Sequence, residues 1–340
     1  MKKRFKVLFS LGFVILITVA LLSESCFGFQ LGGKKNNFPA KPITMIVPYG
    51  PGGSSDVVAR LLSNAALKYF NRPIIIENKP GAASVLGLNA LGDAAPDGYT
   101  VGISNNGMVL QTLVGTPKYN YVEDLSAIAQ VGYVPFVLLV KYDAPWKTLE
   151  EFTKYAKENP NKIKYGHTGV GNTTQITAAL YAKLAGIQIE QIPFDGGGPL
   201  LTALLGGHIQ AMVSNPLEIK EQLKAKRVRV LAIADTKRMK DPLYKGVPTF
   251  KEKGYNDVVI LWQGLAAPKG IPADVSKVLA EGFKKIINDP DVKKSLNDLG
   301  LVTEYLGPQE FQKKWVTERA YFKGVLEDTG IFEMIKNQKK

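Results

Sequence analysis

Three glycine-rich turns carry residue types and a spacing that could bind a ligand. They occupy residues 48–56, 166–174 and 195–199, and each separates a short apolar run from a pattern typical of a helix. Glycine lets the backbone approach a ligand closely, and a helix N-terminus combines unpaired N–H donors with about half a positive charge. The chemistry that these turns favour is therefore non-covalent binding of an anionic group such as a carboxylate.

One such turn on its own is more simply explained as a connection, because glycine turns with Ser, Thr or Asn caps join strands to helices in many α/β proteins. Three turns favour a ligand site, since ligands of open α/β sheets bind outside the carboxyl ends of the strands. Asp56 places a carboxylate beside the first turn. We expect it to cap the helix or to hold the loop by bonding to the loop's own N–H groups.

Several kinds of catalytic or cofactor site lack the residues that they require. A phosphate-binding P-loop requires a lysine after its glycines, and none of the three turns supplies one. Gly169 and Gly171 resemble the start of the Gly-x-Gly-x-x-Gly motif that binds dinucleotides, but the third glycine of that motif is replaced by Thr174. Two histidines, His167 and His208, and the single Cys26 argue against a zinc site or a Cys-His nucleophile. We therefore expect no enzyme activity, no cofactor and no metal site. An exported hydrolase that uses His167 as the base of a serine nucleophile is an alternative.

The turns are positioned by an alternation of short apolar runs and longer amphipathic stretches. Apolar runs bounded by Gly and Pro predict buried parallel strands, and apolar residues three and four positions apart predict the helices between them, so the fold class is α/β. Strands are predicted at residues 43–47, 74–77, 100–104, 136–140, 162–165, 188–192, 211–214 and 228–234. Helices are predicted at 57–70, at 272–287, after the second turn with Ile176, Leu180 and Leu184 buried, and after Pro308 with Phe311, Trp315 and Phe322 buried.

The number of predicted strands is too large for one small sheet, and a chain of 340 residues has the length of roughly two domains. The apolar runs at 131–140 and 258–267 lack a nearby tight hairpin turn. We interpret them as crossings between two lobes. Lobe 1 is predicted to comprise residues 38–138 and 258–340, and lobe 2 residues 139–257.

The N-terminus has the features of an export signal, because Lys2, Lys3, Arg4 and Lys6 precede an apolar run at residues 7–22. We predict a signal peptide at 1–28, a tether at 29–37 and a mature protein in the periplasm or another extracytoplasmic space. A retained membrane anchor is an alternative, since the run falls just short of the roughly 17 to 25 residues that span a bilayer.

Cys26 lies just behind the apolar run, which raises the alternative of a lipid-anchored N-terminus. Ser23 and Glu24 match a lipobox poorly, and cleavage near Gly28 would remove the cysteine altogether.

The formal net charge of +13 includes a net +3 within residues 1–28. The remaining positive charge weakly favours anionic partners. No tight basic cluster with interleaved aromatic residues indicates nucleic acid, so we expect none as a partner.

Several short motifs occur in a fixed order between Phe38 and the C-terminus. They are Phe38-Pro39 with Pro42-Ile43, residues 47–53 with Asp56 and Arg60, residues 77–82, Pro96-Asp97-Gly98-Tyr99-Thr100, Gly169-Val170-Gly171, Gly196-Gly197-Gly198-Pro199, Pro248-Thr249 and Trp262. In these motifs the chain resembles the substrate-binding proteins of the tripartite tricarboxylate transporters, also called the Bug family. So many matches in the same order are specific to that family.

The resemblance implies a two-lobed type II periplasmic-binding-protein fold, in which each lobe is a mostly parallel sheet flanked by helices and two crossing segments join the lobes. It also implies that backbone and hydroxyl groups of the first and second turns hold a ligand carboxylate in the cleft. By position, the ligand-binding residues would be Tyr49, Gly52, Gly53, Ser54, Ser55, Asp56, Thr168, Gly169, Gly171, Asn172 and Thr173, with Ser104, Asn105 and Asp195 as additions.

This sequence departs from the family pattern at three positions near the turns. Asp195 stands where the family often has a basic or neutral residue, Gln175 where a histidine is common, and Asn172 where a small serine is frequent. Asp195 would disfavour a highly charged tricarboxylate, or would meet an amino group of the ligand.

The resemblance therefore implies a monomeric solute-binding subunit that delivers a small carboxylate to integral membrane permease subunits. The alternative is a sensor module, which would bind the ligand in the same cleft and signal to a membrane receptor or kinase.

Overall fold

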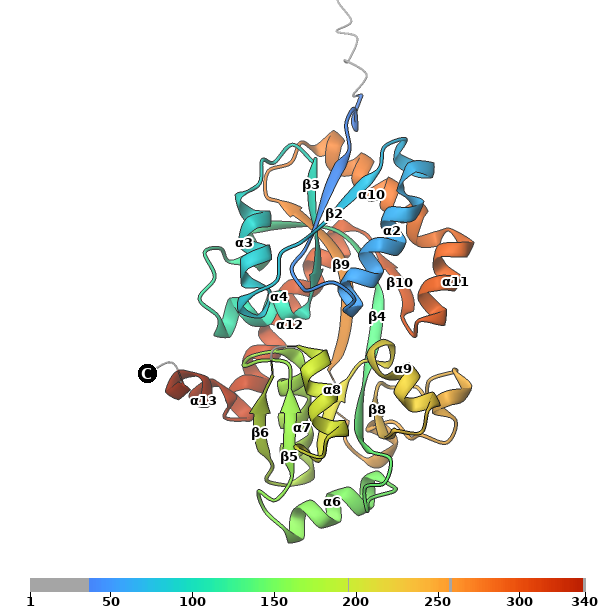
Figure 1. Ribbon diagram of the computed structural model, residues 1–340. Helices are drawn as coiled ribbons and strands as arrows, with labels where there is room; N and C mark the ends of the chain where they lie inside the picture. Colours follow the sequence, from blue (N-terminus) through green and yellow to red (C-terminus); the bar gives the residue numbers. More distant parts are fainter. Residues whose placement is uncertain (1–36, 195, 257–258, 339–340) are drawn as a thin grey trace, which may run out of the picture. The chain divides into compact units, whose positions relative to one another are not determined.

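The computed structural model describes residues 37–338 except residues 195, 257 and 258 (Figure 1). The predicted signal peptide, Cys26, Asp195 and all of the predicted tether before Asn37 lie outside the described residues. The described residues from Phe38 onward form one compact unit. Within the described residues, no helix has both the length and the apolar character needed to cross a membrane.

Strands and helices alternate along most of the chain, as the α/β pattern predicts. The strands are β1 (Ile43–Val47), β2 (Ile74–Asn78), β3 (Thr100–Asn105), β4 (Leu125–Lys141), β5 (Lys164–His167), β6 (Glu190–Pro193), β7 (Ala211–Ser214), β8 (Val228–Ala234), β9 (Ile260–Pro268) and β10 (Val302–Leu306). The helices are α2 (Ser54–Phe70), α3 (Val85–Asp93), α4 (Asn106–Val114), α5 (Tyr121–Asp124), α6 (Leu149–Glu158), α7 (Thr173–Ala185), α8 (Gly197–Leu205), α9 (Pro216–Lys224), α10 (Ala273–Asn288), α11 (Pro290–Asp298), α12 (Pro308–Asp328) and α13 (Ile331–Gln338), with short 3₁₀ helices η2 (Ala82–Ser84), η3 (Pro242–Tyr244) and η4 (Lys251–Lys253).

The strands join in a mixed sheet with the order β2-β1-β3-β9-β4-β7-β5-β6, in which β8 and β10 also pair with β4. At one end β1 lies parallel to β2 and β3, and at the other end β5 lies parallel to β6 and β7. The carboxyl ends of parallel neighbours meet at one edge of a sheet, so the turns that follow β1 and β3 are neighbours, as are those that follow β5, β6 and β7.

The 17-residue strand β4 passes from one group of strands to the other. Its first part, up to Pro135, pairs with β9, and its last part, from Phe136 to Lys141, pairs with β7 and β8. Strand β9 begins with Ile260 opposite Pro135, where this change of partners occurs. The predicted crossing at 131–140 is therefore part of β4, and most of the run at 258–267 forms β9 beside it.

Helix α12 covers the two long strands and buries the stripe that the sequence predicts there. Phe311 and Trp315 are fully buried and pack on Trp262 of β9, and the ring centroids of Trp262 and Phe311 lie 4.9 Å apart in an edge-to-face arrangement. Gly264 of β9 has no room for a side chain, because a Cβ there would lie 2.3 Å from Phe311 Cζ. This contact fixes the helix against the point at which β4 changes partners.

One prediction about the core is wrong. Leu184 was expected to lie buried in α7 with Ile176 and Leu180, but its side chain is 43% exposed. At this end of the helix the buried face passes through Ala182 and Ala185, and residue 184 points about 100° away from residue 185 because each helical residue rotates by that angle.

Candidate functional site

The first turn connects β1 to α2. Gly53 is the N-cap of α2, and within the described part of the chain no side chain caps this helix end. Its φ of −74° is one that any residue adopts, and a Cβ there would meet only the Gly50 carbonyl oxygen, at 3.6 Å. The first N–H groups of α2 therefore have no side-chain acceptor among the described residues, and unpaired N–H groups at a helix N-terminus suit an anionic ligand.

Asp56 ties the first turn to the sheet. Its carboxylate accepts hydrogen bonds from the Gly52 N–H at 2.9 Å, from Arg60 Nε at 2.8 Å and from Asn78 Nδ2 at 2.9 Å. Burial acts to raise the pKa of Asp56, but the hydrogen bonds from Arg60, Gly52 and Asn78 outweigh it and hold the pKa below its usual range. These contacts are those expected of a residue that holds the loop.

A buried polar cluster joins the first turn to β3 and β9. The Tyr49 hydroxyl donates to Asn105 Oδ1 at 2.9 Å, and the same oxygen accepts from the Gly107 N–H and caps α4. Ser55 Oγ donates to Gln263 Oε1 at 3.1 Å, and Gln263 Nε2 donates to Ser54 Oγ at 3.2 Å. The cluster therefore brings the predicted residues Tyr49, Ser54, Ser55 and Asn105 together around Gln263.

Gln263 and Asn78 were not predicted as part of the site. Gln263 is fully buried in β9, and its polar side chain within the apolar run at 258–267 is a signal in the sequence that could have identified it. Asn78 belongs to a motif of the family resemblance, but its contact with Asp56 depends on the pairing of β1 with β2, which the sequence alone does not specify.

The second turn connects β5 to α7. Asn172 is the N-cap of α7, and no described side chain caps this helix end either. The turn is held from within, because the Gly171 N–H donates to Gln175 Oε1 at 2.7 Å and the Thr168 N–H donates to Thr174 Oγ1 at 3.0 Å. Gly169 has a φ of 113°, which favours glycine.

The predicted residues of the second turn lie together. Asn172 Nδ2 donates to the Thr168 carbonyl at 3.4 Å, and Thr173 Oγ1 donates to Asn172 Oδ1 at 3.0 Å. His167, at the end of β5, is buried, and its Nδ1 lies 2.9 Å from the Gly169 carbonyl oxygen. Burial lowers the pKa of His167, so the ring is neutral at neutral pH and braces the turn.

Helix α4 links the two turns. It starts after Asn105 in the polar cluster and ends at Val114, whose side chain lies against the second turn: a Cβ on Gly171 would lie 2.5 Å from Val114 Cγ2. Helix α7 itself contacts α4 and α12. Nine helical residues span roughly 13 Å, which is the length of the helix between the polar cluster and the second turn.

The third turn differs from the first two. Its Asp195 lies outside the described residues, and Gly196 is the N-cap of α8 with a φ of 102°. A carboxylate of the chain itself lies here, because a Cβ on Gly197 would be 2.8 Å from Glu218 Oε2, which accepts a hydrogen bond from Ser214 Oγ at 2.8 Å. The space in front of Gly197 is thus already next to the carboxyl group of Glu218, whose pKa is raised by burial.

No group of His, Cys, Asp and Glu side chains that could hold a metal ion occurs among the described residues.

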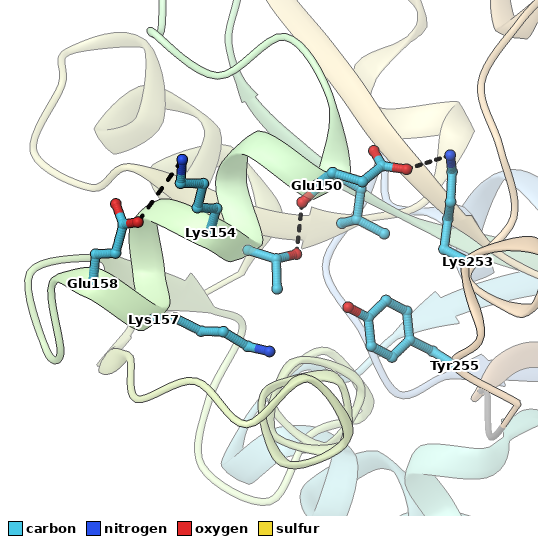
Figure 2. Close-up of a pocket in the computed structure, with 8 residues that line it drawn as sticks. Glu150, Lys154, Lys157, Glu158, Lys253 and Tyr255 are labelled. Carbon is cyan, nitrogen blue, oxygen red and sulfur yellow. Dashed lines mark hydrogen bonds and ion pairs between the residues drawn. The ribbon is translucent and has the colours of Figure 1, made fainter.

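A pocket of about 380 Å³ lies elsewhere, between α6 and the segment at Lys253 and Tyr255 (Figure 2). Its ammonium groups are largely matched by carboxylates, since Lys253 pairs with Glu150 and Lys154 lies 3.9 Å from Glu158. None of its lining residues belongs to the glycine turns, so we do not place the predicted carboxylate there.

Residues 58–331 match the family model described as "Tripartite tricarboxylate transporter family receptor". A Cupriavidus necator protein named "UPF0065 protein in gbd 5′ region" is 33% identical over 298 residues, which cover 87% of this chain and 90% of that protein. Protein BugT of Bordetella pertussis is 29% identical over 87% of this chain and 91% of its own length.

Two solved structures show the same fold over nearly their whole length. A TctC solute binding protein from Polaromonas, determined without ligand, has a TM-score of 0.68 and 32% identity and covers 85% of this chain and 99% of its own. MatC from Rhodopseudomonas palustris with bound malate has a TM-score of 0.71 and 29% identity and covers 88% of this chain and 99% of its own. The predicted two-lobed α/β fold class is confirmed.

Proposed function

The chain belongs to the tripartite tricarboxylate transporter receptor family, a family of solute-binding proteins and not of enzymes, and on that basis we propose that it captures a small carboxylate between its first and second glycine turns. The observation that carries the proposal is the pair of helices α2 and α7, which follow β1 and β5 and have no side-chain cap within the described residues. The bound malate of MatC, a protein of the same fold, supports this class of ligand.

The donors at the two helix ends suit a carboxylate. N–H groups in the first turn of a helix have no partner within the helix, and each charge-assisted hydrogen bond contributes roughly 1.5 to 3 kcal/mol. Asp56 lies beside them, but its charge is already matched by Arg60 and by its hydrogen bonds with Gly52 and Asn78. The first turn can therefore accept one ligand carboxylate without facing an unpaired acid.

We further propose that the cleft lies between lobe 1, residues 38–138 and 258–340, and lobe 2, residues 139–257. Strand β4 passes between the two groups of strands at Pro135 and Phe136, with the start of β9 beside it. Bending at this point would bring the second turn onto a carboxylate docked on the first. Contacts made only in the closed state would then drive closure.

The family of solute-binding receptors works outside the cytoplasm, and we propose the same location for this chain after removal of the predicted signal peptide. Delivery of the ligand to integral membrane permease subunits, with the receptor acting as a monomer, belongs to the same proposal.

Ligand binding is tested by thermal denaturation with a panel of succinate, malate, citrate, adipate, glutamate and benzoate, and by mass spectrometry of acids released from the purified protein. A ligand at 100 times its Kd stabilises the folded state by about 2.7 kcal/mol, which raises the melting temperature by about 5 °C. If no acid of the panel shifts the melting temperature and none co-purifies, the proposal fails.

A matched pair of variants locates the site. Gly53→Val adds a side chain at the uncapped end of α2, where the backbone tolerates it, and should abolish the shift that the ligand causes. Gly324→Val adds the same side chain in α12, where a Cβ meets nothing within 4 Å, and should leave the shift unchanged. Equal ligand shifts in the two variants would place the carboxylate elsewhere.

A further inference from the structure

Helix α6 lies at the end of the sheet opposite the second glycine turn. Strand β5 leads into that turn, and its other end begins soon after α6 finishes. Val140 of β4 and Tyr165 of β5 both pair with Ala211 of β7, so β4 finishes where β5 begins. Strand β8 also begins here, with Val228 opposite Lys141. We call this surface, which comprises residues 141–164, 226–229 and 253–255, the α6 end.

The α6 end carries an excess of positive charge, since it holds ten Lys or Arg residues and four Asp or Glu residues. Three lysines are matched within the surface, in the pairs Lys141–Asp143, Lys154–Glu158 and Lys253–Glu150. Arg229 lies over the ring of Tyr142, at 4.7 Å from its centroid. The other six are exposed and have no ion-pair partner among the described residues: Lys147, Lys157, Lys162, Lys164, Lys226 and Arg227. A surface of this kind attracts acidic partners.

The pocket of about 380 Å³ opens in this surface (Figure 2). Its floor is held firmly, because the buried Thr153 shares a hydrogen bond of 2.7 Å with the Tyr181 hydroxyl. The Tyr181 ring packs edge-to-face on Tyr255, with the centroids 5.3 Å apart. The ammonium group of Lys157 and the hydroxyl of Tyr255 point into the space between them (Figure 2). The pocket thus combines an unmatched cation, a hydroxyl donor and an aromatic ring, which together suit a carboxylate on a short apolar stem.

The carboxylates within the α6 end favour a protein as the partner over a membrane. Glu150, Glu151 and Glu158 are exposed among the lysines of α6. A membrane of anionic lipids would present negative charge to these carboxylates as well as to the lysines, and like charges repel. A protein surface can place its acidic side chains opposite the lysines alone.

We propose that the α6 end docks an acidic segment of a partner protein, one carboxylate of which enters the pocket and meets Lys157 and Tyr255. This site goes beyond the proposed function, because none of the pocket's lining residues belongs to the glycine turns. The partner can therefore bind whether or not a ligand occupies those turns.

The test measures, by calorimetry at low ionic strength, the binding of a short peptide of alternating Glu and Ser and of the same peptide with Gln in place of Glu. The wild type should bind the Glu peptide more tightly than the Gln peptide. Lys157→Gln should weaken binding about three- to five-fold, and Tyr255→Phe, which keeps the ring and the charge, about three-fold. Lys277→Gln removes an exposed lysine of α10 and should leave the affinity unchanged. No preference for the Glu peptide, equal losses in the two lysine variants, or full affinity in Tyr255→Phe would each overturn the proposal.

Two further measurements separate this site from the alternatives. Vesicles of phosphatidylglycerol and phosphatidylcholine should bind the wild type and Lys157→Gln equally weakly. If the wild type binds them and Lys157→Gln does not, the surface serves a membrane and the proposal is wrong. Gly53→Val, which alters the end of α2, should bind the Glu peptide as the wild type does. Loss of peptide binding in that variant would place the peptide at the glycine turns and would also overturn the proposal, whereas failure of the proposed function leaves the peptide result unchanged.

Discussion

Raising the pH from 5 to 8 should destabilise the folded protein through Glu318. This carboxyl group lies on α12 and accepts a hydrogen bond from Trp262 Nε1 at 2.5 Å. Trp262 lies on β9 opposite Tyr133 of β4, close to the point at which β4 stops pairing with β9. Burial raises the pKa of Glu318 from 4.5 to about 7, against the opposing effects of the Trp262 hydrogen bond and of Lys314. The side chain is therefore protonated in the folded state at mildly acidic pH.

The direction of the effect follows from the difference in proton binding. Between pH 4.5 and about 7 the unfolded chain has released the proton of Glu318, whereas the folded chain retains it. The folded state binds more protons over this window, so the free energy of unfolding falls as the pH rises. The gap between the two pKa values corresponds to roughly 3 kcal/mol, most of which is lost by pH 8.

The assay is guanidinium unfolding of the wild type and of Glu318→Gln at pH 5, 6, 7 and 8, because the difference between the two cancels the titration of all other groups. The variant should gain stability relative to the wild type as the pH rises, by up to roughly 3 kcal/mol. Glu123→Gln is the control: Arg319 lowers the pKa of Glu123, so that group stays ionised across this range and its difference from the wild type should be constant. A constant difference for Glu318→Gln as well would refute the reasoning.

Three further variants test the site and its supports. Gly171→Val should lower the free energy of unfolding by several kcal/mol, because valine would be forced to a φ of 75° and its Cβ would lie 2.5 Å from Val114 Cγ2. Adding Val114→Ala to the Gly171→Val protein should partly restore the melting temperature, because it removes that clash. Ala83→Gly should stabilise by about 0.5 to 1 kcal/mol in urea unfolding by relieving a φ of 51°, whereas Ala65→Gly within α2 should destabilise by about 1 kcal/mol. Asp56→Ala should cost roughly 2 to 4 kcal/mol by removing a buried carboxylate with three donors, and this loss should shrink in acid as the pH falls through the lowered pKa of Asp56. An equal loss at pH 7 and pH 2 would contradict the last expectation.

The sequence predicts the buried strands well, because their apolar runs are bounded by turn residues. The predicted bounds of β1, β7 and β8 agree with the structure, and β4 and β9 account for the two long apolar runs. Strand β10 was missed because it is an edge strand with no buried residue, so its side chains carry no apolar pattern. The length of β4 was also missed, because only residues 136–140 were predicted as a strand and β4 covers Leu125–Lys141. The change of pairing partner in the middle of this strand leaves no mark in the sequence.

The candidate site was predictable where it depends on local sequence and unpredictable where it depends on tertiary contacts. The two glycine turns follow from a strand, a turn and a helix in succession. Their partners Gln263 and Val114 come from distant parts of the chain and are identified only by the pairing of β9 with β3 and by the contact of α4 with α7. The left-handed run at Ala83 was equally hidden, because alanine rarely adopts that conformation and carries no signal for it.

The glycines of the two turns differ in what they do, although their spacing suggests one role. The N–H of Gly52 already donates to Asp56 and that of Gly171 to Gln175, so both are engaged within the chain. The donors that remain for a carboxylate are those of the first turns of α2 and α7, whose N-caps Gly53 and Asn172 supply no side-chain acceptor within the described residues. Asp56 and Gln175 are the third residues of α2 and α7, and each accepts a hydrogen bond from an N–H of the turn that precedes its helix. The first N–H groups of the two helices remain without a side-chain cap among the described residues. A substitution of either side chain should therefore weaken ligand binding by loosening the turn, even though neither needs to touch the ligand.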